Sequence, residues 1–315
     1  MSGELFTASD VYHGDPLRPD LETVTPDEIV AGLSREDRQR RVKHLVLQSH
    51  SILRSALDEY AEGRTIAAKA ILFSGGSDST VLAYLMRHHA SHAIHANTGI
   101  GIESTRQFVR DTCKEWGLPL IEPKAEGNDT YRALVLDQGF PGPGHHFKMY
   151  QRLKERQLRK AKKQLLDGAE RGSRVVFIAG RRRAESKRRA GIPLHEREGS
   201  VIWVSPLAMW TKLDLNTYRD MHPDMPGPCD ASALIHMSGE CLCGAFAHPG
   251  ELDEIGEWFP EVKAEIEALE REVKAAGWPE PWCRWGHGQG KASEAGRLCS
   301  SCDARFIPGQ TAMDV

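Results

Sequence analysis

Apolar residues recur along the chain with two different spacings, and each spacing predicts one kind of element. From Ser34 to Gly63 they recur every three or four residues, which predicts an amphipathic helix that Gly63 ends. Short apolar runs bounded by turn residues predict buried strands, and they occupy residues 67–73, 93–97, 118–122, 175–179 and 201–204. Helical patterns lie between these runs, at residues 79–88, 103–116 and 149–171.

Strands that alternate with helices predict parallel βαβ units, and therefore an α/β fold with a doubly wound parallel sheet. Ligands of such sheets bind at the carboxyl ends of the strands, so the functional loops are expected after Phe73, Asn97 and Ala179. Three parts are expected along the chain. They are an extended N-terminal arm (residues 1–33), a sheet domain (34–225) and a Cys-rich C-terminal appendage (226–315) with one amphipathic helix at 260–276.

Composition narrows the class of protein. The 315 residues carry a net charge of −3 and a mean hydropathy of −0.46. No run approaches roughly 18 apolar residues, which argues against a membrane span, and residues 1–10 lack the regions of a secretory signal. The expected location is therefore the cytoplasm, where thiols stay reduced. Seven cysteines there are better explained as ligands, nucleophiles or buried side chains than as disulfides.

Charge is distributed unevenly. Residues 148–189 contain 16 Lys and Arg but only 4 Asp and Glu, so this segment is suited to meet anions. A solvated helix face is the simpler explanation of such a run, and the motifs described next favour an anion instead.

The strongest local motif is Ser74-Gly75-Gly76-Ser77-Asp78-Ser79, between a predicted strand and a predicted helix. Two glycines allow a tight turn, backbone N–H groups meet the positive end of a helix, and the serine hydroxyls add donors. Together they suit a phosphate or pyrophosphate. Asp78 would serve a bridging Mg²⁺. The alternative is a Gly-rich turn with a serine cap, and the motif is not a Walker P-loop because it has no Gly-Lys-Ser/Thr.

This loop resembles the PP-loop of the ATP pyrophosphatase superfamily. Four further segments resemble its phosphoadenosine-phosphosulfate reductase group, at residues 95–100, 147–154, 180–189 and 205–218. The resemblance implies an adenine nucleotide alpha-hydrolase-like fold, with residues 34–225 as the nucleotide-binding domain.

The resemblance also implies site residues, and guanidinium groups suit phosphate because they bind it bidentately. The pyrophosphate part of ATP would be held by Ser74, Gly75, Gly76, Ser77, Asp78 and Ser79. Phosphate or sulfate oxygens would be contacted by Arg182, Ser186 and Arg189. The base and ribose would lie near Asn97, Thr98 and Gly99. Asp78, Arg182 and Arg189 are the expected catalytic residues.

Six of the seven cysteines lie in the appendage, where Cys241-x-Cys243 and Cys299-x-x-Cys302 are chelating pairs typical of a thiolate metal site. The candidate ligands are Cys229, Cys241, Cys243, Cys299 and Cys302, and scattered buried thiols are the alternative. The surrounding segments have little apolar periodicity, so a metal would supply their folding energy. Cys283 is the weakest candidate, and Cys113 is expected to be a buried side chain.

The type of metal centre follows from the resemblance alone. Relatives of the DNA phosphorothioation pathway carry a four-iron cluster after this domain, which favours an iron–sulfur cluster, with Zn²⁺ as the alternative. Five candidate ligands for four positions leave one thiol free to carry sulfur.

The predicted function is an ATP-dependent adenylating enzyme that releases pyrophosphate and serves sulfur transfer to, or modification of, a nucleic acid. Its expected cofactors are ATP, Mg²⁺ and the metal centre. Its expected partners are an adenine nucleotide, DNA or RNA, and a cysteine desulfurase-type sulfur donor, with no membrane. Two alternatives stay open: a sulfonucleotide (APS or PAPS) reductase, which the absence of a cysteine after Cys302 disfavours, and a catalytically silent nucleotide-binding partner module, which the intact Ser-Gly-Gly-x-Asp-Ser motif disfavours.

Overall fold

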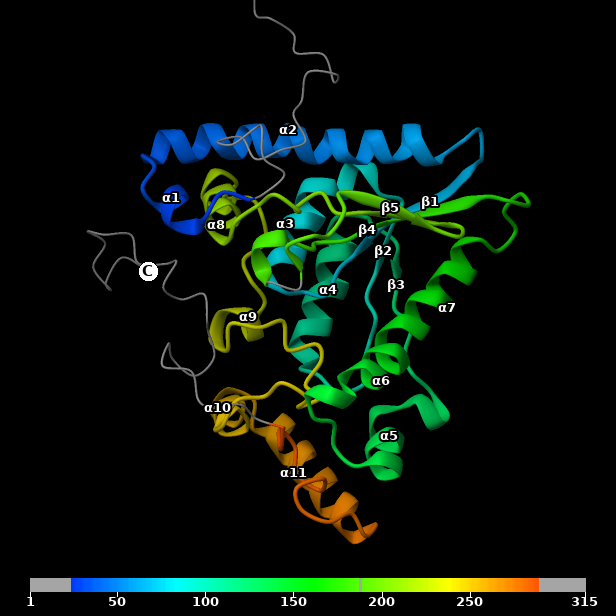
Figure 1. The fold of residues 1–315 in the computed structure, drawn as a ribbon, viewed down its shortest axis with the longest axis vertical. Helices are drawn as coiled ribbons and strands as arrows, with labels where there is room; N and C mark the ends of the chain where they lie inside the picture. Colours follow the sequence, from blue (N-terminus) through cyan, green and yellow to red (C-terminus); the bar gives the residue numbers. More distant parts are fainter. Residues whose placement is uncertain (1–23, 187–188, 289–315) are drawn as a thin grey trace, which may run out of the picture.

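The computed structural model describes residues 24–186 and 189–288, and a six-stranded sheet forms its centre (Figure 1). The strands lie in the order β3-β2-β1-β4-β6-β5, and all neighbours are parallel except β5 and β6. Their bounds are Ile66–Leu72 for β1, His92–Ile94 for β2, Leu120–Ile121 for β3, Arg174–Ile178 for β4, His195–Glu198 for β5 and Val201–Val204 for β6. The expected doubly wound α/β sheet is confirmed.

The chain reverses its direction across the sheet between β1 and β4. From β1 it proceeds outward to β2 and β3, and it then returns past β1 to β4 and β6 on the other side. β1 and β4 are therefore neighbours whose following segments leave in opposite directions. Such a switch point opens a crevice at the carboxyl ends of the two strands, which is where ligands bind in this class of sheet.

The five predicted strands are present, although β2 and β3 are shorter than expected. Beyond Ile94, single hydrogen bonds continue the pairing, from His95 N–H to Ile121 O and from Asn97 N–H to Pro123 O. The sixth strand, β5, was not predicted. It reads His-Glu-Arg-Glu, so no apolar run marks it, and it pairs with β6 through its backbone at an edge that faces solvent.

Helices cover both faces of the sheet. One face carries α2 (Arg35–Tyr60), α3 (Ser77–Met86), α4 (Glu103–Glu115) and α8 (Lys212–Met221), which share one apolar cluster with β1, β4 and β6. The other face carries α7 (Arg156–Leu165), whose Ala161 and Leu165 pack with Val175 and Phe177. No helix in the described ranges is long and apolar enough to cross a membrane.

Two helical predictions differ from the structure. The helix expected at 149–171 begins earlier, as α6 (His146–Tyr150), continues through a π-helical turn at Gln151–Glu155 into α7, and ends at Leu165. Gly168, with a φ of +71°, lies just beyond this end. A short helix, α1 (Asp27–Ala31), lies within the arm that was expected to be extended, and residues 1–23 lie outside the described chain.

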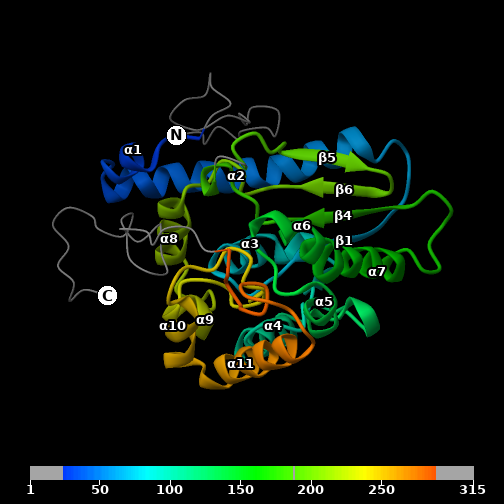
Figure 2. The same cartoon turned by 60° about the horizontal axis from the view of Figure 1, so that its bottom comes forward.

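The appendage builds an apolar core, contrary to the expectation from its weak periodicity. α9 (Asp230–Leu234), α10 (Glu251–Trp258) and α11 (Pro260–Ala275) lie at the end of the molecule away from α2 (Figures 1 and 2). Ile266 and Leu269 of α11 share a buried cluster with Tyr131 of α5 (Tyr131–Gln138) and with Phe140. The partner side chains come from a distant part of the sequence, so the core has no local signature. Burial of these side chains stabilises the appendage, so a metal is not its only source of folding energy.

A buried ion pair holds α2 against α8. Arg41 Nε and Nη2 donate to the two carboxylate oxygens of Asp214 at 2.9 and 3.1 Å, and the two side chains are 1% and 0% exposed. Asp214 also accepts from the backbone N–H of Thr211 at 2.8 Å and completes the capping box of α8. The pair therefore fixes where α8 begins, and α8 carries Lys212 towards the switch point.

We expect Arg41→Ala to lower the free energy of unfolding by about 3–5 kcal/mol, because it leaves a buried carboxylate without its partner. The matched control is Arg40→Ala. Arg40 is 77% exposed and pairs with Asp37 at the surface, so its loss should cost less than about 1 kcal/mol. Urea unfolding measures both variants, and equal effects would contradict the role given to the buried pair.

Candidate functional site

The loop after β1 is shaped for close backbone approach. Gly75 has a φ of +79°, and a Cβ there would lie 2.7 Å from Thr105 Cγ2. A Cβ at Gly76 would lie 2.9 Å from the Cβ of Ser238. Both positions therefore require glycine, one for its conformation and one because the appendage packs directly on the loop.

The same loop begins α3 and places hydrogen-bond donors at the N-terminus of that helix. Gly76 is the N-cap of α3, so the first N–H groups of the helix, from Ser77 onward, have no intrahelical acceptor and meet the positive end of the helix dipole. Ser74 Oγ and Ser79 Oγ lie 3.0 Å apart on the same turn. N–H and hydroxyl groups that suit a phosphate group thus lie together on this turn, and phosphate binding there stays a prediction.

Asp78 joins this loop to the loop after β4. Arg182 Nε donates to Asp78 Oδ2 at 2.7 Å, and Lys212 Nζ donates to Asp78 Oδ1 at 3.1 Å. Burial raises the pKa of the Asp78 carboxyl, but the two neighbouring cations outweigh it, and the net shift is downward. Asp78 is therefore ionised at neutral pH, and the ion pairs close the crevice between β1 and β4.

Two of the cations at this site were missed from sequence. Lys212 Nζ also donates to Ser77 Oγ at 3.0 Å, and Arg219 Nη2 donates to the backbone oxygen of Ser77 at 2.7 Å. Burial lowers the pKa of Arg219 from its ordinary value. Both residues lie on α8 seven positions apart, so they share one face of that helix, and this spacing is the signal that could have found them. Three cations thus contact the loop, which has one carboxylate.

A Mg²⁺ ion that bridges Asp78 and the phosphates stays a prediction. In this structure each oxygen of Asp78 accepts a hydrogen bond from a cation, from Arg182 or from Lys212. Within the described ranges, no group of three His, Cys, Asp or Glu side chains could hold a metal ion. The arrangement favours direct contact between cations and phosphate oxygens instead.

The structure separates two residues that were grouped with Arg182. Ser186 is exposed, and Arg189 pairs with Glu185 on the same short segment rather than with the loop after β1. Arg182, in contrast, is buried and reaches the loop directly. Residues 187 and 188 lie outside the described chain.

The second of the expected functional loops follows β2 and contains Asn97, Thr98 and Gly99, and most of its side chains point inward. Asn97 Nδ2 donates to Glu122 Oε1 at 2.8 Å, and Thr98 Oγ1 donates to the backbone oxygen of Glu240 at 2.5 Å. Gly99 is exposed and has a φ of +76°. Asn97 and Thr98 thus shape the loop, and Gly99 is the member of the three that faces outward.

A buried hydrogen-bond chain ties the appendage to both loops. His95 Nδ1 lies 2.8 Å from the backbone oxygen of Phe73, and His95 Nε2 lies 2.9 Å from Glu240 Oε2. A carbonyl oxygen only accepts, so Nδ1 carries a proton, and the contact with Glu240 needs a second proton between its two atoms. Glu240 Oε1 accepts from Thr98 N–H at 2.9 Å.

Backbone contacts place the first cysteine pair beside the second loop. Ile102 N–H donates to Gly239 O at 2.8 Å, and Leu242 N–H donates to Ile100 O at 2.9 Å. A Cβ at Gly101 would lie 2.5 Å from Glu240 O, so this approach requires glycine. Residues 239–242 are therefore bound along residues 100–102, next to the end of β2.

The described cysteines do not converge on one point. Cys241 is half-buried and Cys243 is buried, and the interaction between the two neighbouring thiols lowers the pKa of Cys241 and raises that of Cys243. Cys229 lies instead near Thr105 Oγ1, at 3.7 Å. Two of the five candidate ligands are thus side by side. Cys299 and Cys302 lie outside the described residues.

We expect Asp78→Asn to bind inorganic pyrophosphate more tightly than the wild type, because it releases Arg182 and Lys212 from their shared carboxylate. Arg182→Met should weaken the same binding by about 1.5–3 kcal/mol, the value of a hydrogen bond to a charged group. Arg181→Met is the control, because Arg181 contacts Ser205 and Glu196. Calorimetry measures all three, and weaker binding by Asp78→Asn would contradict this account of the site.

Comparisons with known proteins find a family match in the part of the chain that contains these loops. Residues 68–224 match the family model of the phosphoadenosine phosphosulfate reductase domain. The chain is 32% identical to the adenosine 5'-phosphosulfate reductase of Mesorhizobium japonicum over 90 residues. These aligned residues make up 29% of this chain and 35% of that protein. The chain therefore spans about a third of the length of that relative.

Two solved structures show a distant likeness. The phosphoadenylyl-sulfate reductase of Candida auris has 18% identity and a TM-score of 0.41 over 62% of this chain and 90% of that one. The FMN adenylyltransferase of Candida glabrata has 11% identity and a TM-score of 0.42 over 66% and 67% of the two chains. Both TM-scores are low, and the assignment rests on neither. On the family match and the loops that it spans, residues 68–224 form a domain of the phosphoadenosine phosphosulfate reductase-like family of the PP-loop superfamily.

Proposed function

We propose that the protein is an ATP pyrophosphatase that adenylates an acceptor, releases pyrophosphate and thereby prepares sulfur transfer to a nucleic acid. The observation that carries the proposal is the contact of Arg182 and Lys212 with Asp78 at the switch point, directly beside the N-terminus of α3. A phosphate chain bound there would meet N–H donors on one side and cations on the other.

The proposed chemistry is an in-line displacement at the α-phosphorus. The N–H groups at the start of α3 and the hydroxyls of Ser74 and Ser79 would hold the terminal phosphates. Arg182 and Lys212 would exchange Asp78 for the oxygens of the leaving pyrophosphate, and Arg219 would add a third positive charge. Asp78 keeps the two cations in position beforehand, so little reorganisation is needed as charge develops.

A polynucleotide acceptor is supported by one surface. Phe147 and Tyr150 of α6 are 64% and 41% exposed, and Phe246 is 60% exposed with its ring 4.7 Å from that of His146. Exposed aromatic rings beside cations such as Lys148 suit stacking on unpaired bases.

The basic helix itself supplies less free charge than its sequence indicates. Arg152 and Arg156 both pair with Asp129, Arg159 pairs with Glu155, and Lys160 lies 3.5 Å from Glu126. Many of its cations are thus neutralised by neighbours, and phosphate contact is proposed for Lys148, Lys162 and Lys163.

The second candidate function is a sulfonucleotide reductase, which the Mesorhizobium relative favours. In that case a phosphosulfate would occupy the same cradle, and a cysteine thiolate of the appendage would attack its sulfur and expel the nucleotide phosphate. The external thiol reductant would then attack the resulting S-sulfocysteine, release sulfite and leave a disulfide. Cys241 is the best placed of the described thiols, because residues 239–242 are bound next to the end of β2.

We expect pyrophosphate release from ATP that increases when single-stranded DNA or RNA is added. We expect Asp78→Ala to abolish this release without loss of helical circular dichroism, because Arg182 and Lys212 lose the carboxylate that positions them for the leaving pyrophosphate. Sulfite release from a phosphosulfate with a thiol reductant, in the absence of pyrophosphate release, would favour the reductase. Nucleotide binding with neither product would identify a silent module and contradict the proposal.

An iron–sulfur cluster, or zinc as the alternative, is proposed for thiolates drawn from Cys229, Cys241, Cys243, Cys299 and Cys302. The adjacent thiols of Cys241 and Cys243 support two ligand positions. When bound, such a centre would cross-link the appendage and could supply sulfur or electrons.

We expect protein purified without oxygen to contain iron with acid-labile sulfide, or zinc, and Cys241→Ser to lose it. Cys113→Ser is the control, because Cys113 is buried in α4 and burial raises its pKa to about 12. Wild-type protein without either metal would contradict this part of the proposal.

A further inference from the structure

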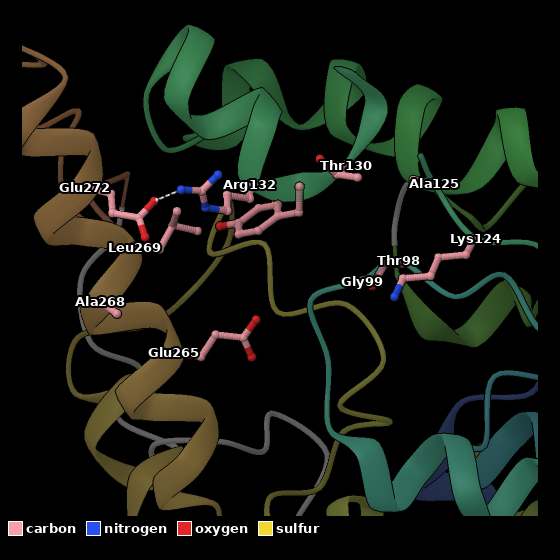
Figure 3. A pocket seen from close by; sticks show the side chains of 11 residues that line it. Thr98, Gly99, Lys124, Ala125, Thr130, Arg132, Glu265, Ala268, Leu269 and Glu272 are labelled. Atoms are coloured by element: carbon pink, nitrogen blue, oxygen red, sulfur yellow. Dashed lines mark ion pairs between the residues drawn. The ribbon is translucent and has the colours of Figure 1, made fainter. Parts of the chain in front are cut away.

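A cavity of about 280 Å³ lies between the sheet domain and the appendage, apart from the phosphate cradle (Figure 3). Four segments line it: the loop after β2, the loop after β3, the start of α5, and α11. Their lining residues are Thr98, Gly99, Lys124, Ala125, Thr130, Tyr131, Arg132, Glu265, Ala268, Leu269 and Glu272. Gly99 belongs to the loop expected near the nucleotide, so the cavity adjoins the proposed ATP site.

Two opposite charges face the cavity from different walls. Lys124 comes from the loop after β3 and Glu265 from α11, and Figure 3 shows them on opposite sides. Neither forms an ion pair with another of the described residues, whereas Arg132 and Glu272 pair with each other at 2.6 Å. One cation and one carboxylate are thus available to a ligand.

The walls between these charges are largely apolar and fixed. Tyr131 and Leu269 are 3% and 6% exposed, and Ala125 and Ala268 complete the lining. Tyr131 Oη donates to the backbone oxygen of Cys243 at 3.1 Å, which holds its ring in place and connects the cavity to the cysteine pair. Such walls suit a flat, weakly polar body with polar edges.

From this arrangement we infer that the cavity binds a guanine base, with Glu265 accepting from its N1 and N2 donors and Lys124 donating to its O6 and N7. A carboxylate only accepts and an ammonium only donates. Of the four standard bases, guanine alone has two adjacent donors on one edge, and its O6 and N7 form an acceptor pair. Adenine offers no such edge, so the site differs from one for the base of ATP.

The inference rests on the proposed function only for the role of the base, which would be part of the acceptor. Guanine could reach the cavity as a free nucleotide or as an unpaired base of a strand. Binding itself is tested without ATP, so failure of adenylation and failure of this site are distinguishable.

The first test is calorimetry with guanosine, inosine and adenosine monophosphates. We expect guanosine monophosphate to bind about tenfold more tightly than the other two, because inosine lacks the N2 donor and adenosine lacks both donors. Equal binding of the three, no binding of guanosine monophosphate, or its displacement by ATP would overturn the inference.

The second test is Glu265→Gln, whose exposed position on α11 leaves the fold unaffected. This variant should bind guanosine monophosphate about tenfold more weakly than the wild type does. It should also bind guanosine and inosine monophosphates with equal affinity. The matched control is Glu267→Gln on the same helix, outside the lining, which should bind as the wild type does. Equal effects of the two variants would overturn the inference.

The source of the base is tested with single-stranded thymidine oligonucleotides that contain one dG or one dA. A strand is identified as the source if the dG oligonucleotide binds more tightly than guanosine monophosphate and if Glu265→Gln weakens this binding. A strand that binds without regard to dG, together with specific binding of guanosine monophosphate, identifies the free nucleotide. Loss of specificity for both would overturn the inference.

Discussion

The ion pairs of Asp78 with Arg182 and Lys212 are the constraint on which the site depends. Asp78 lies in the first turn of α3, Arg182 follows β4, and Lys212 begins α8, so one carboxylate holds together three segments that are far apart in sequence. Without it, like charges at the switch point would repel each other in a partly buried crevice. With it, the cations are held ready for an anion that can replace the carboxylate.

The position of α8 in turn depends on the buried pair of Arg41 and Asp214, because Asp214 caps the helix that carries Lys212 and Arg219. The appendage is bound to the second loop in a comparable way, through Glu240 and the backbone of residues 239–242. The cysteine pair is therefore located by the nucleotide domain, and a change at either loop can reach it through the contact of Glu240 with His95 and Thr98. This coupling is consistent with a thiol centre that acts on a substrate held at the sheet.

Features with a local cause were predictable from sequence. Buried strands of a parallel sheet are continuous apolar runs in the sequence. The two glycines that the loop before α3 requires are consecutive residues, so the sequence shows them directly. Features that depend on distant partners were not. Lys212 and Arg219 have no motif of their own, β5 pairs through its backbone with a polar sequence, and the core of the appendage needs Tyr131 and Phe140 from the sheet domain. The charge available on the basic segment was unpredictable for the same reason, since Asp129 pairs with two of its arginines from outside the run.

The proposed function requires the phosphates of ATP to lie at the switch point between β1 and β4. The decisive measurement is a crystal structure of the protein with a non-hydrolysable ATP analogue. We expect the phosphate oxygens to contact the N–H groups at the start of α3, and Arg182 to leave Asp78 and bind these oxygens. Phosphates bound elsewhere, or an Arg182 still paired with Asp78 beside the bound analogue, would contradict it.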